Sequence, residues 1–195
     1  TMLVEPIRAY ADTRSGFIDE MVRIIGAAQK DEMSRQKFGG QMRSAIRKFG
    51  LIAMRDGMNE VGYDPESFSR EELAKFRQWQ ETQSAYVGGL SSEMFKEGGI
   101  TENEVRLRAS MWASITLESA RQLGLLLGKP GQMMEWVLGR TEEHCDDCMR
   151  LNGQVHSIQA WTDSGWTPTS GKTECKSFNC DCTLRPTTKP EQGNF

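Results

Sequence analysis

The stretches Ser69-Arg70-Glu71-Glu72 and Thr101-Glu102-Asn103-Glu104 share the form Ser/Thr-x-x-Glu. In this form the first hydroxyl can accept a hydrogen bond from the backbone N–H three residues later, while the glutamate accepts one from the first residue's N–H. Apolar residues follow both stretches at three- and four-residue steps, the spacing that gathers them on one face of a helix. Both stretches therefore predict the start of an amphipathic helix.

Glycine-rich breaks indicate where these two helices end. The first carries apolar residues from Leu73 to Met94 and should stop at Gly98-Gly99. The second carries them from Val105 to Leu126 and should stop at Gly128-Lys129-Pro130-Gly131, because proline disrupts a helix interior.

Two similar patterns lie earlier in the chain. Ser15 can cap a helix with apolar residues from Ile18 to Ala28. After an interruption at Gly39-Gly40, a second helix should carry apolar residues from Met42 to Ala53. We therefore expect residues 1–131 to form an extended region of four amphipathic helices.

The overall charge is nearly balanced. The chain has 195 residues, of which 24 are basic and 27 acidic, so its net charge is −3. Such a balance gives no overall attraction to nucleic acid. Within residues 1–60, ten basic and eight acidic residues are typical of a solvated helix surface. We expect neither a membrane span nor a secretory signal, because no apolar run has the necessary length.

The pattern changes after Gly131. Met134, Trp136 and Leu138 alternate with other residues, which predicts a strand. Two further short strands are expected at 154–156 and 182–185, with a turn-rich loop at 164–171 between them. Residues 187–195 are polar and predict a flexible tail.

All of the cysteines lie in the last quarter of the chain. Cys145 and Cys148 form a C-x-x-C pair, and the other three form a later cluster: Cys175, Cys180 and Cys182. This layout predicts a structural zinc site in which one loop supplies two thiolates and a second loop completes the ligands. Thiolates are favoured over disulfides because no export signal is present and because the number of cysteines is odd.

The ligand set has alternatives. Cys145 and Cys148 are expected to bind together, with two of Cys175, Cys180 and Cys182, of which we favour the first two. One or more cysteines could instead be buried thiols, or Cys180 and Cys182 could form a disulfide. His144 and His156 could be ligands or catalytic bases, but such residues more often hydrogen-bond to nearby backbone.

The fold class that follows is mainly α, with a small C-terminal α+β zinc-knuckle module at 132–186. Three short strands bury little apolar surface, so a bound Zn²⁺ should supply much of the module's folding free energy. Among the tryptophans, Trp112 and Trp136 should lie in the core because both fall on apolar stripes. Trp161 and Trp166 fall in the irregular region between the strands expected at 154–156 and 182–185, and they are candidates for a partner interface.

Two segments carry a family resemblance. They are His144-Cys145-x-x-Cys148-x-x-Leu151-Asn152-Gly153 and, after a tryptophan-containing loop with Pro168, Asn179-Cys180-Asp181-Cys182-Thr183-Leu184-Arg185-Pro186. This pattern resembles the C-terminal signature of the Mu F-like head morphogenesis proteins of tailed bacteriophages, C-x-x-C-x-x-L-x-G followed by N-C-R-C-x-L-x-P. The resemblance covers about residues 132–186, and the preceding helices fit the family in kind only. Asp181 departs from the pattern, because the family usually has arginine there, and family members are often longer.

The resemblance implies a minor head (minor capsid) protein present in several copies per particle. Its implied partners are the portal protein and the major capsid protein, with packaged DNA as a further possible contact and no membrane. The implied location is the phage head near the portal vertex, after assembly in the host cytoplasm. Head assembly and DNA packaging or ejection are the implied roles, and the zinc is implied to be structural.

Two other classes of function compete with this one. A zinc-dependent hydrolase or nuclease could use His144 or His156 with a carboxylate, but the sequence has no H-E-x-x-H, nucleophile elbow or phosphate loop. A zinc-ribbon nucleic-acid binder should carry clustered basic residues on the module. Here a comparable number of acidic residues balances them. The sequence therefore favours a structural protein that is not an enzyme.

Overall fold

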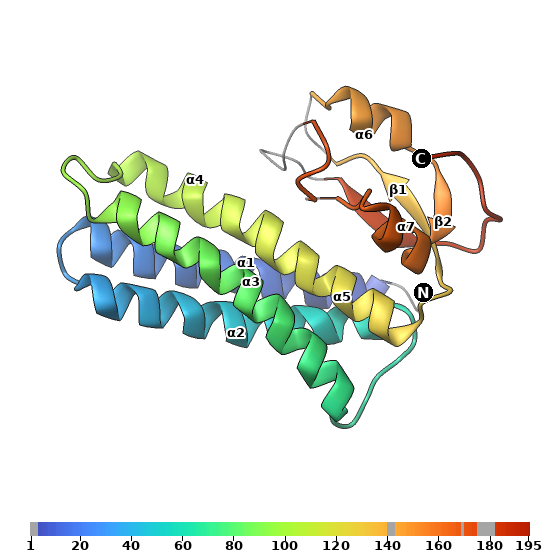
Figure 1. Cartoon of the computed structure of the whole chain (residues 1–195), viewed down its shortest axis with the longest axis horizontal. Helices are drawn as coiled ribbons and strands as arrows, with labels where there is room; N and C mark the ends of the chain where they lie inside the picture. Colours follow the sequence, from blue (N-terminus) through green and yellow to red (C-terminus); the bar gives the residue numbers. More distant parts are fainter. Residues whose placement is uncertain (1–3, 140–142, 169, 175–181) are drawn as a thin grey trace.

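The computed structural model describes residues 4–139, 143–168, 170–174 and 182–195. The chain is mainly helical, with long helices lying lengthwise beside one another and a small sheet against one end of them (Figure 1). The helical part contains α1 (Val4–Gln29), α2 (Arg35–Glu60), α3 (Arg70–Met94), α4 (Glu102–Trp112), the π-helical segment η1 (Ala113–Leu117) and α5 (Glu118–Gly128). The rest contains β1 (Met133–Val137), α6 (Asp146–Leu151), β2 (Val155–Ser157), α7 (Ile158–Ser164) and β3 (Thr183–Pro186).

Both predicted capping stretches begin helices. The backbone N–H of Glu72 donates to Ser69 Oγ over 3.2 Å, and the N–H of Ser69 donates to Glu72 Oε2 over 2.6 Å. At the second stretch, the backbone N–H and the hydroxyl of Thr101 both donate to Glu104 Oε2. The sequence prediction of helix starts at these two places is confirmed.

The first two helices are longer than predicted. Helix α1 starts well before Ser15, and α2 starts after Ser34, whose Oγ accepts from the N–H of Lys37. The predicted interruption at Gly39-Gly40 is wrong, because α2 continues through it. The flanking side chains Phe38 and Met42 are fully buried, and their packing outweighs the low helix propensity of glycine.

The helical core is built from side chains of six elements, α1, α2, α3, α4, η1 and α5. Its fully buried members include Phe17 and Met21 of α1, Met42 and Ile46 of α2, and Leu117 of η1.

In the described residues, no helix combines the length and the apolar character that crossing a membrane requires.

Helices α2 and α5 touch through their backbones. A Cβ atom at Gly57 would overlap the carbonyl oxygen of Arg121, and one at Gly124 would overlap the carbonyl oxygen of Met54. Only glycine permits this separation at both crossing points. The close approach brings the buried polar side chains of α2 and α5 within hydrogen-bonding reach of each other.

The C-terminal sheet is antiparallel, with strand order β2-β1-β3. Met134 pairs with His156 on one side of β1, and Trp136 pairs with Leu184 on the other. The three strands lie where the sequence predicted them, to within about a residue at each end. Their inward side chains form an apolar cluster with Leu125 of α5, so the sheet packs directly on the helical part.

Helices α6 and α7 were not predicted. Ser157 Oγ caps α7 by accepting from the N–H of Ala160 over 3.1 Å, and α7 ends at Gly165, which has φ of +73°. This helix carries Trp161 into the core, where it is fully buried. The predicted amount of buried apolar surface in the module is therefore too small, because side chains of α6 and α7 join those of the strands in one buried cluster.

Residues beyond β3 make contacts that the sequence did not predict. Val155 and Gln192 exchange two backbone hydrogen bonds of 2.8 Å. The Lys189 ammonium pairs with the Glu135 carboxylate over 2.7 Å. The ring of Phe195 lies 4.2 Å from the ring of His156, measured between centroids. The C-terminal segment thus lies along the outer edge of β2.

Candidate metal centre

Three of the five predicted ligands fall within the described residues. Cys145 is the N-cap residue of α6, Cys148 lies within that helix, and Cys182 directly precedes β3. Cys148 and Cys182 are buried members of the apolar cluster of the sheet, and Cys145 packs against it. Cys175 and Cys180 lie outside the described part of the chain.

The first turn of α6 shapes the C-x-x-C pair. Cys145 has extended backbone angles, and its carbonyl oxygen accepts a hydrogen bond from the N–H of Met149 over 3.0 Å. Residues three apart at the start of a helix lie on the same side of it. Both thiol-bearing residues therefore lie on the side of α6 that packs on the sheet.

His144 lies next to the second cysteine segment. Its Nδ1 is 3.9 Å from Cys182 Sγ. This contact joins residues that precede α6 to residues that precede β3, and it brings together the two ends of the predicted site. Sequence reasoning ranked His144 as a residue that bonds to nearby backbone, whereas the structure places its ring against a cysteine of the site.

Asp147 links α6 to the segment that leads into the remaining cysteines. Its Oδ2 accepts a hydrogen bond from the backbone N–H of Glu174 over 2.9 Å, and its Oδ1 lies 3.5 Å from Arg150 Nη2. Glu174 directly precedes Cys175 in the sequence. Asp147 thus holds the backbone of Glu174 close to α6.

The described cysteines come from two separate segments, one that holds Cys145 and Cys148 and one that holds Cys182. Sulfur ligands contributed by two separate segments are typical of structural zinc sites. Within residues 4–139, 143–168, 170–174 and 182–195, no group of three or more His, Cys, Asp or Glu side chains could hold a metal ion. A metal site at these cysteines would therefore have to include residues outside the described part of the chain.

His156, the other histidine considered as a ligand, lies in a different environment. It is buried between the rings of Trp161 and Phe195, with its Nδ1 3.0 Å from Glu191 Oε1 and its Nε2 3.4 Å from Gln154 Oε1. The structure gives both ring nitrogens carboxylate or amide partners. These contacts indicate a structural role in holding the C-terminal segment against β2.

One tryptophan, Trp161, lies in a different environment from the predicted one. Trp136 is fully buried, as predicted, and Trp112 is partly buried against the helical core. Trp161 was predicted to lie at an interface, which is wrong, because α7 turns it inward and its Nε1 donates to the carbonyl oxygen of Met134 over 3.0 Å. Trp166 is partly exposed, with the Arg150 guanidinium 4.8 Å and the Lys172 ammonium 4.2 Å from its ring centroid.

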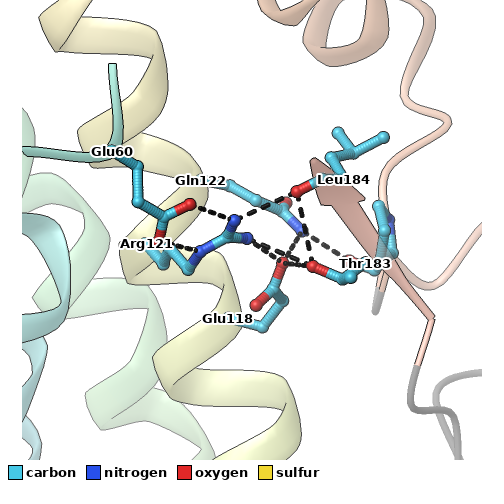
Figure 2. Close-up of polar contacts among 7 residues, drawn as sticks. Glu60, Glu118, Arg121, Gln122, Thr183 and Leu184 are labelled. Atoms are coloured by element: carbon cyan, nitrogen blue, oxygen red, sulfur yellow. Dashed lines mark hydrogen bonds and ion pairs between the residues drawn. The ribbon is translucent and has the colours of Figure 1, made fainter. Parts of the chain in front are cut away.

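A buried arginine fixes β3 on the helical part (Figure 2). Arg121 of α5 donates to both carboxylate oxygens of Glu60, over 2.7 and 2.5 Å, and to Glu118 Oε1 over 3.0 Å. Its Nη2 also donates to the carbonyl oxygen of Leu184, and Thr183 Oγ1 lies 3.3 Å from its Nη1. Because Thr183 and Leu184 directly follow Cys182, the network sets the position of that cysteine relative to α5.

The charged groups of this network change one another's pKa values. Burial raises the pKa of Glu118 above its ordinary value, and the charge of Arg121 offsets part of that rise. Burial opposes the charge of Arg121, but Glu118 and Glu60 outweigh it and raise the pKa of the guanidinium well above its ordinary value. Sequence reasoning missed this network, because only the spacing Glu118-x-x-Arg121 is visible locally and Glu60 is distant in the chain.

Comparison of the chain with protein-family models, with curated proteins and with solved structures gives no match.

Proposed function

We propose that this chain is a structural minor head protein of a tailed bacteriophage. In this proposal it associates with the portal protein and the inner surface of the capsid, and supports head assembly and DNA packaging or ejection. The observation that carries the proposal is the meeting of the two signature segments. Cys148 and Leu151 from the first segment share one buried cluster with Cys182 and Leu184 from the second.

Other positions of the signature have structural reasons for their residue types. Gly153 has φ of +79°, a backbone conformation that favours glycine, and its N–H donates to the carbonyl oxygen of Trp136 over 2.9 Å. Pro186 is the last residue of β3, opposite Met134. A signature whose described members each have a place in one small unit supports the resemblance as more than a chance spacing of cysteines.

We further propose that the module holds one structural Zn²⁺. Cys145 and Cys148 would bind it together with ligands from Cys175, Cys180 and Cys182. The convergence of Cys145, Cys148 and Cys182 on one cluster supports this assignment, as does the bond from Asp147 to the residue before Cys175. When bound, the ion would join the two segments and thereby stabilise the module.

The environment of the candidate catalytic groups favours a structural role over hydrolysis. A general base needs a nitrogen or carboxylate within reach of a substrate's proton. His156 is 4% exposed and packs between two aromatic rings, and Asp147 is committed to the backbone of Glu174 and to Arg150. These contacts support a role in which the side chains hold segments of the chain together.

The test is incorporation into particles. Cells that carry the complete phage genome should be induced, and the particles should be purified on a density gradient and analysed by quantitative mass spectrometry. We expect the chain to band with the heads and to cross-link to the portal protein. Particles that assemble and package DNA normally after deletion of the gene, with the chain absent from wild-type heads, would contradict the proposal.

A further inference from the structure

A cavity of about 360 Å³ lies between α3 and the run of α4 into η1. Helices α3 and α4 are joined at the left of Figure 1 and run back along each other. The apolar and aromatic part of the lining comes from Tyr86 and Leu90 of α3, Met111 and Trp112 of α4, and Ile115 of η1. Cavities of this size and character are typical of small-molecule sites.

Two polar bridges across the cavity set its ends. Thr116 Oγ1 of η1 donates to Gln83 Oε1 of α3 over 3.1 Å, and Arg108 of α4 pairs with Glu93 of α3. All four of these residues line the cavity. Gln83 and Glu93 are about 15 Å apart along α3, at the rise of an α-helix. The cavity is therefore a bounded site for one compact group rather than a groove along the whole helix.

The helix changes type where it lines the cavity. Ile115 and Thr116 both line the cavity, and both belong to the π-helical segment η1. Single π-helical turns are rare inside α-helices and are frequent at functional sites. The position of η1 is an observation independent of the volume of the cavity, and it points to the same place.

The polar groups of the lining define the chemistry of a ligand. Arg108 and Glu93 neutralise each other, so the lining offers no net charge to an ion. Gln83 is 6% exposed, and its Oε1 is occupied by Thr116. Its Nε2 is then the group that can donate to an acceptor on a ligand. With the indole of Trp112 beside it, this amide favours a flat apolar body that carries an acceptor.

We propose that this cavity binds an uncharged aromatic molecule that carries one hydrogen-bond acceptor. The ring lies against Leu90, Trp112 and Ile115, and the acceptor receives a hydrogen bond from Gln83 Nε2. This inference does not depend on the proposed role in the phage head or on any metal site. Its success or failure is therefore separate from theirs.

The direct test compares three molecules with the same ring and different charges. Benzamide, benzoate and benzylammonium are titrated at pH 7 into the full chain labelled with ¹⁵N-tryptophan. We expect benzamide to shift the indole N–H resonance of Trp112 with a Kd of about 1 mM, in keeping with its few atoms. The two ions should bind at least about 10-fold more weakly, because the apolar lining penalises their desolvation. Equal affinities for the three molecules, or a Trp112 resonance that benzamide does not shift, would overturn the proposal.

Two variants locate the binding. Ile115→Trp fills the cavity and should abolish the binding of benzamide, with helical circular dichroism as the check of folding. The matched control is Ile52→Trp, at a position of α2 that is 40% exposed and does not line the cavity, and it should bind benzamide as the wild type does. Undiminished binding by a folded Ile115→Trp protein would place the ligand elsewhere and overturn the proposal.

A third variant tests the amide and does not depend on a larger side chain being accommodated. Gln83→Met keeps the length of the side chain and removes the donor. It should weaken benzamide binding by about 5-fold, the value of one hydrogen bond, and leave the binding of toluene, which has no acceptor, unchanged. A merely structural role of Gln83 would change both affinities equally. Equal changes for the two molecules, or no change for either, would contradict the assigned donor.

Discussion

Arg121 in α5 donates a hydrogen bond from Nη2 to the carbonyl oxygen of Leu184 in β3 over 3.0 Å. The same guanidinium binds Glu60 of α2 and Glu118 of α5, and its side chain is only 5% exposed. One buried cation therefore ties the edge of the sheet to two helices. Its partners come from widely separated parts of the chain, so the sheet is integrated with the helical part.

Replacement of this arginine should be costly. Arg121→Met leaves Glu60 and Glu118 buried without a cation, and loss of one partner from a buried ion pair typically costs about 3–5 kcal/mol. The free energy of unfolding can be measured by urea denaturation. Arg23→Ala, which breaks the exposed pair with Glu20, is the control and should cost less than about 1 kcal/mol. Equal losses in the two variants would contradict the structural role of the network.

Two glycine-to-alanine substitutions should have opposite effects on stability, because Gly124 lies where α2 and α5 cross and Gly88 does not. Gly124→Ala places a methyl group on the carbonyl oxygen of Met54, and such overpacking should cost about 1–3 kcal/mol. Gly88 lies in α3, is exposed and has no atom near its Cβ position. Gly88→Ala should therefore stabilise the protein by about 0.5–1 kcal/mol. Thermal unfolding of both variants would reveal the difference, and a stabilising Gly124→Ala would refute the close backbone contact.

The stability of the helical part should depend on the protonation of Asp56. This residue is buried in α2, and its Oδ2 accepts from Thr13 Oγ1 over 2.8 Å. Burial raises the pKa of the Asp56 carboxyl above its ordinary value of 3.8. The folded state thus binds the proton more tightly than the unfolded state does, so this contribution to stability is complete below pH 3.8 and is lost as the pH rises through the raised pKa.

Asp56→Asn removes that loss, because the amide stays neutral and can still accept from Thr13. The variant should match the wild type below the ordinary pKa of aspartate and exceed it in stability at pH 7. The measurement is the difference in free energy of unfolding between the two proteins across this pH range. A difference that does not change with pH would show that Asp56 is equally charged in the folded and unfolded states.

The cysteine pair should be needed for the order of the module. We expect the double variant Cys145→Ser, Cys148→Ser to lose zinc and to become sensitive to proteases beyond residue 131. Helical circular dichroism should remain close to that of the wild type. Met149→Ser is the matched control, because Met149 lies in the same helix, directly after Cys148, and its side chain is exposed. Unchanged protease resistance in the double variant would show that the apolar cluster holds the module without the metal.

The sequence correctly predicted features that depend on interactions between residues close together in the chain. The capping stretches at Ser69 and Thr101 begin helices because their hydrogen bonds are made within four residues. Gly39-Gly40 misled the prediction, because the burial of Phe38 and Met42 is a tertiary effect. Helix α7 was missed because its short length gave turn residues more weight than the cap at Ser157, and Trp161 was consequently placed on the surface.

The candidate site shows the same division. The spacing of Cys145 and Cys148 predicted that they lie together, and the structure places both on one side of α6. The contact of His144 with Cys182 and the bond from Arg121 to Leu184 join residues far apart in the chain. Such contacts depend on how the sheet packs on α5, and no pattern within a short window can predict them.

The zinc content of the purified protein tests the central claim most directly. The protein should be expressed in zinc-containing medium, purified without chelator and analysed by inductively coupled plasma mass spectrometry, with the double cysteine variant in parallel. We expect about one zinc ion per chain in the wild type and almost none in the variant. Wild-type protein that is folded and contains no zinc would contradict the account.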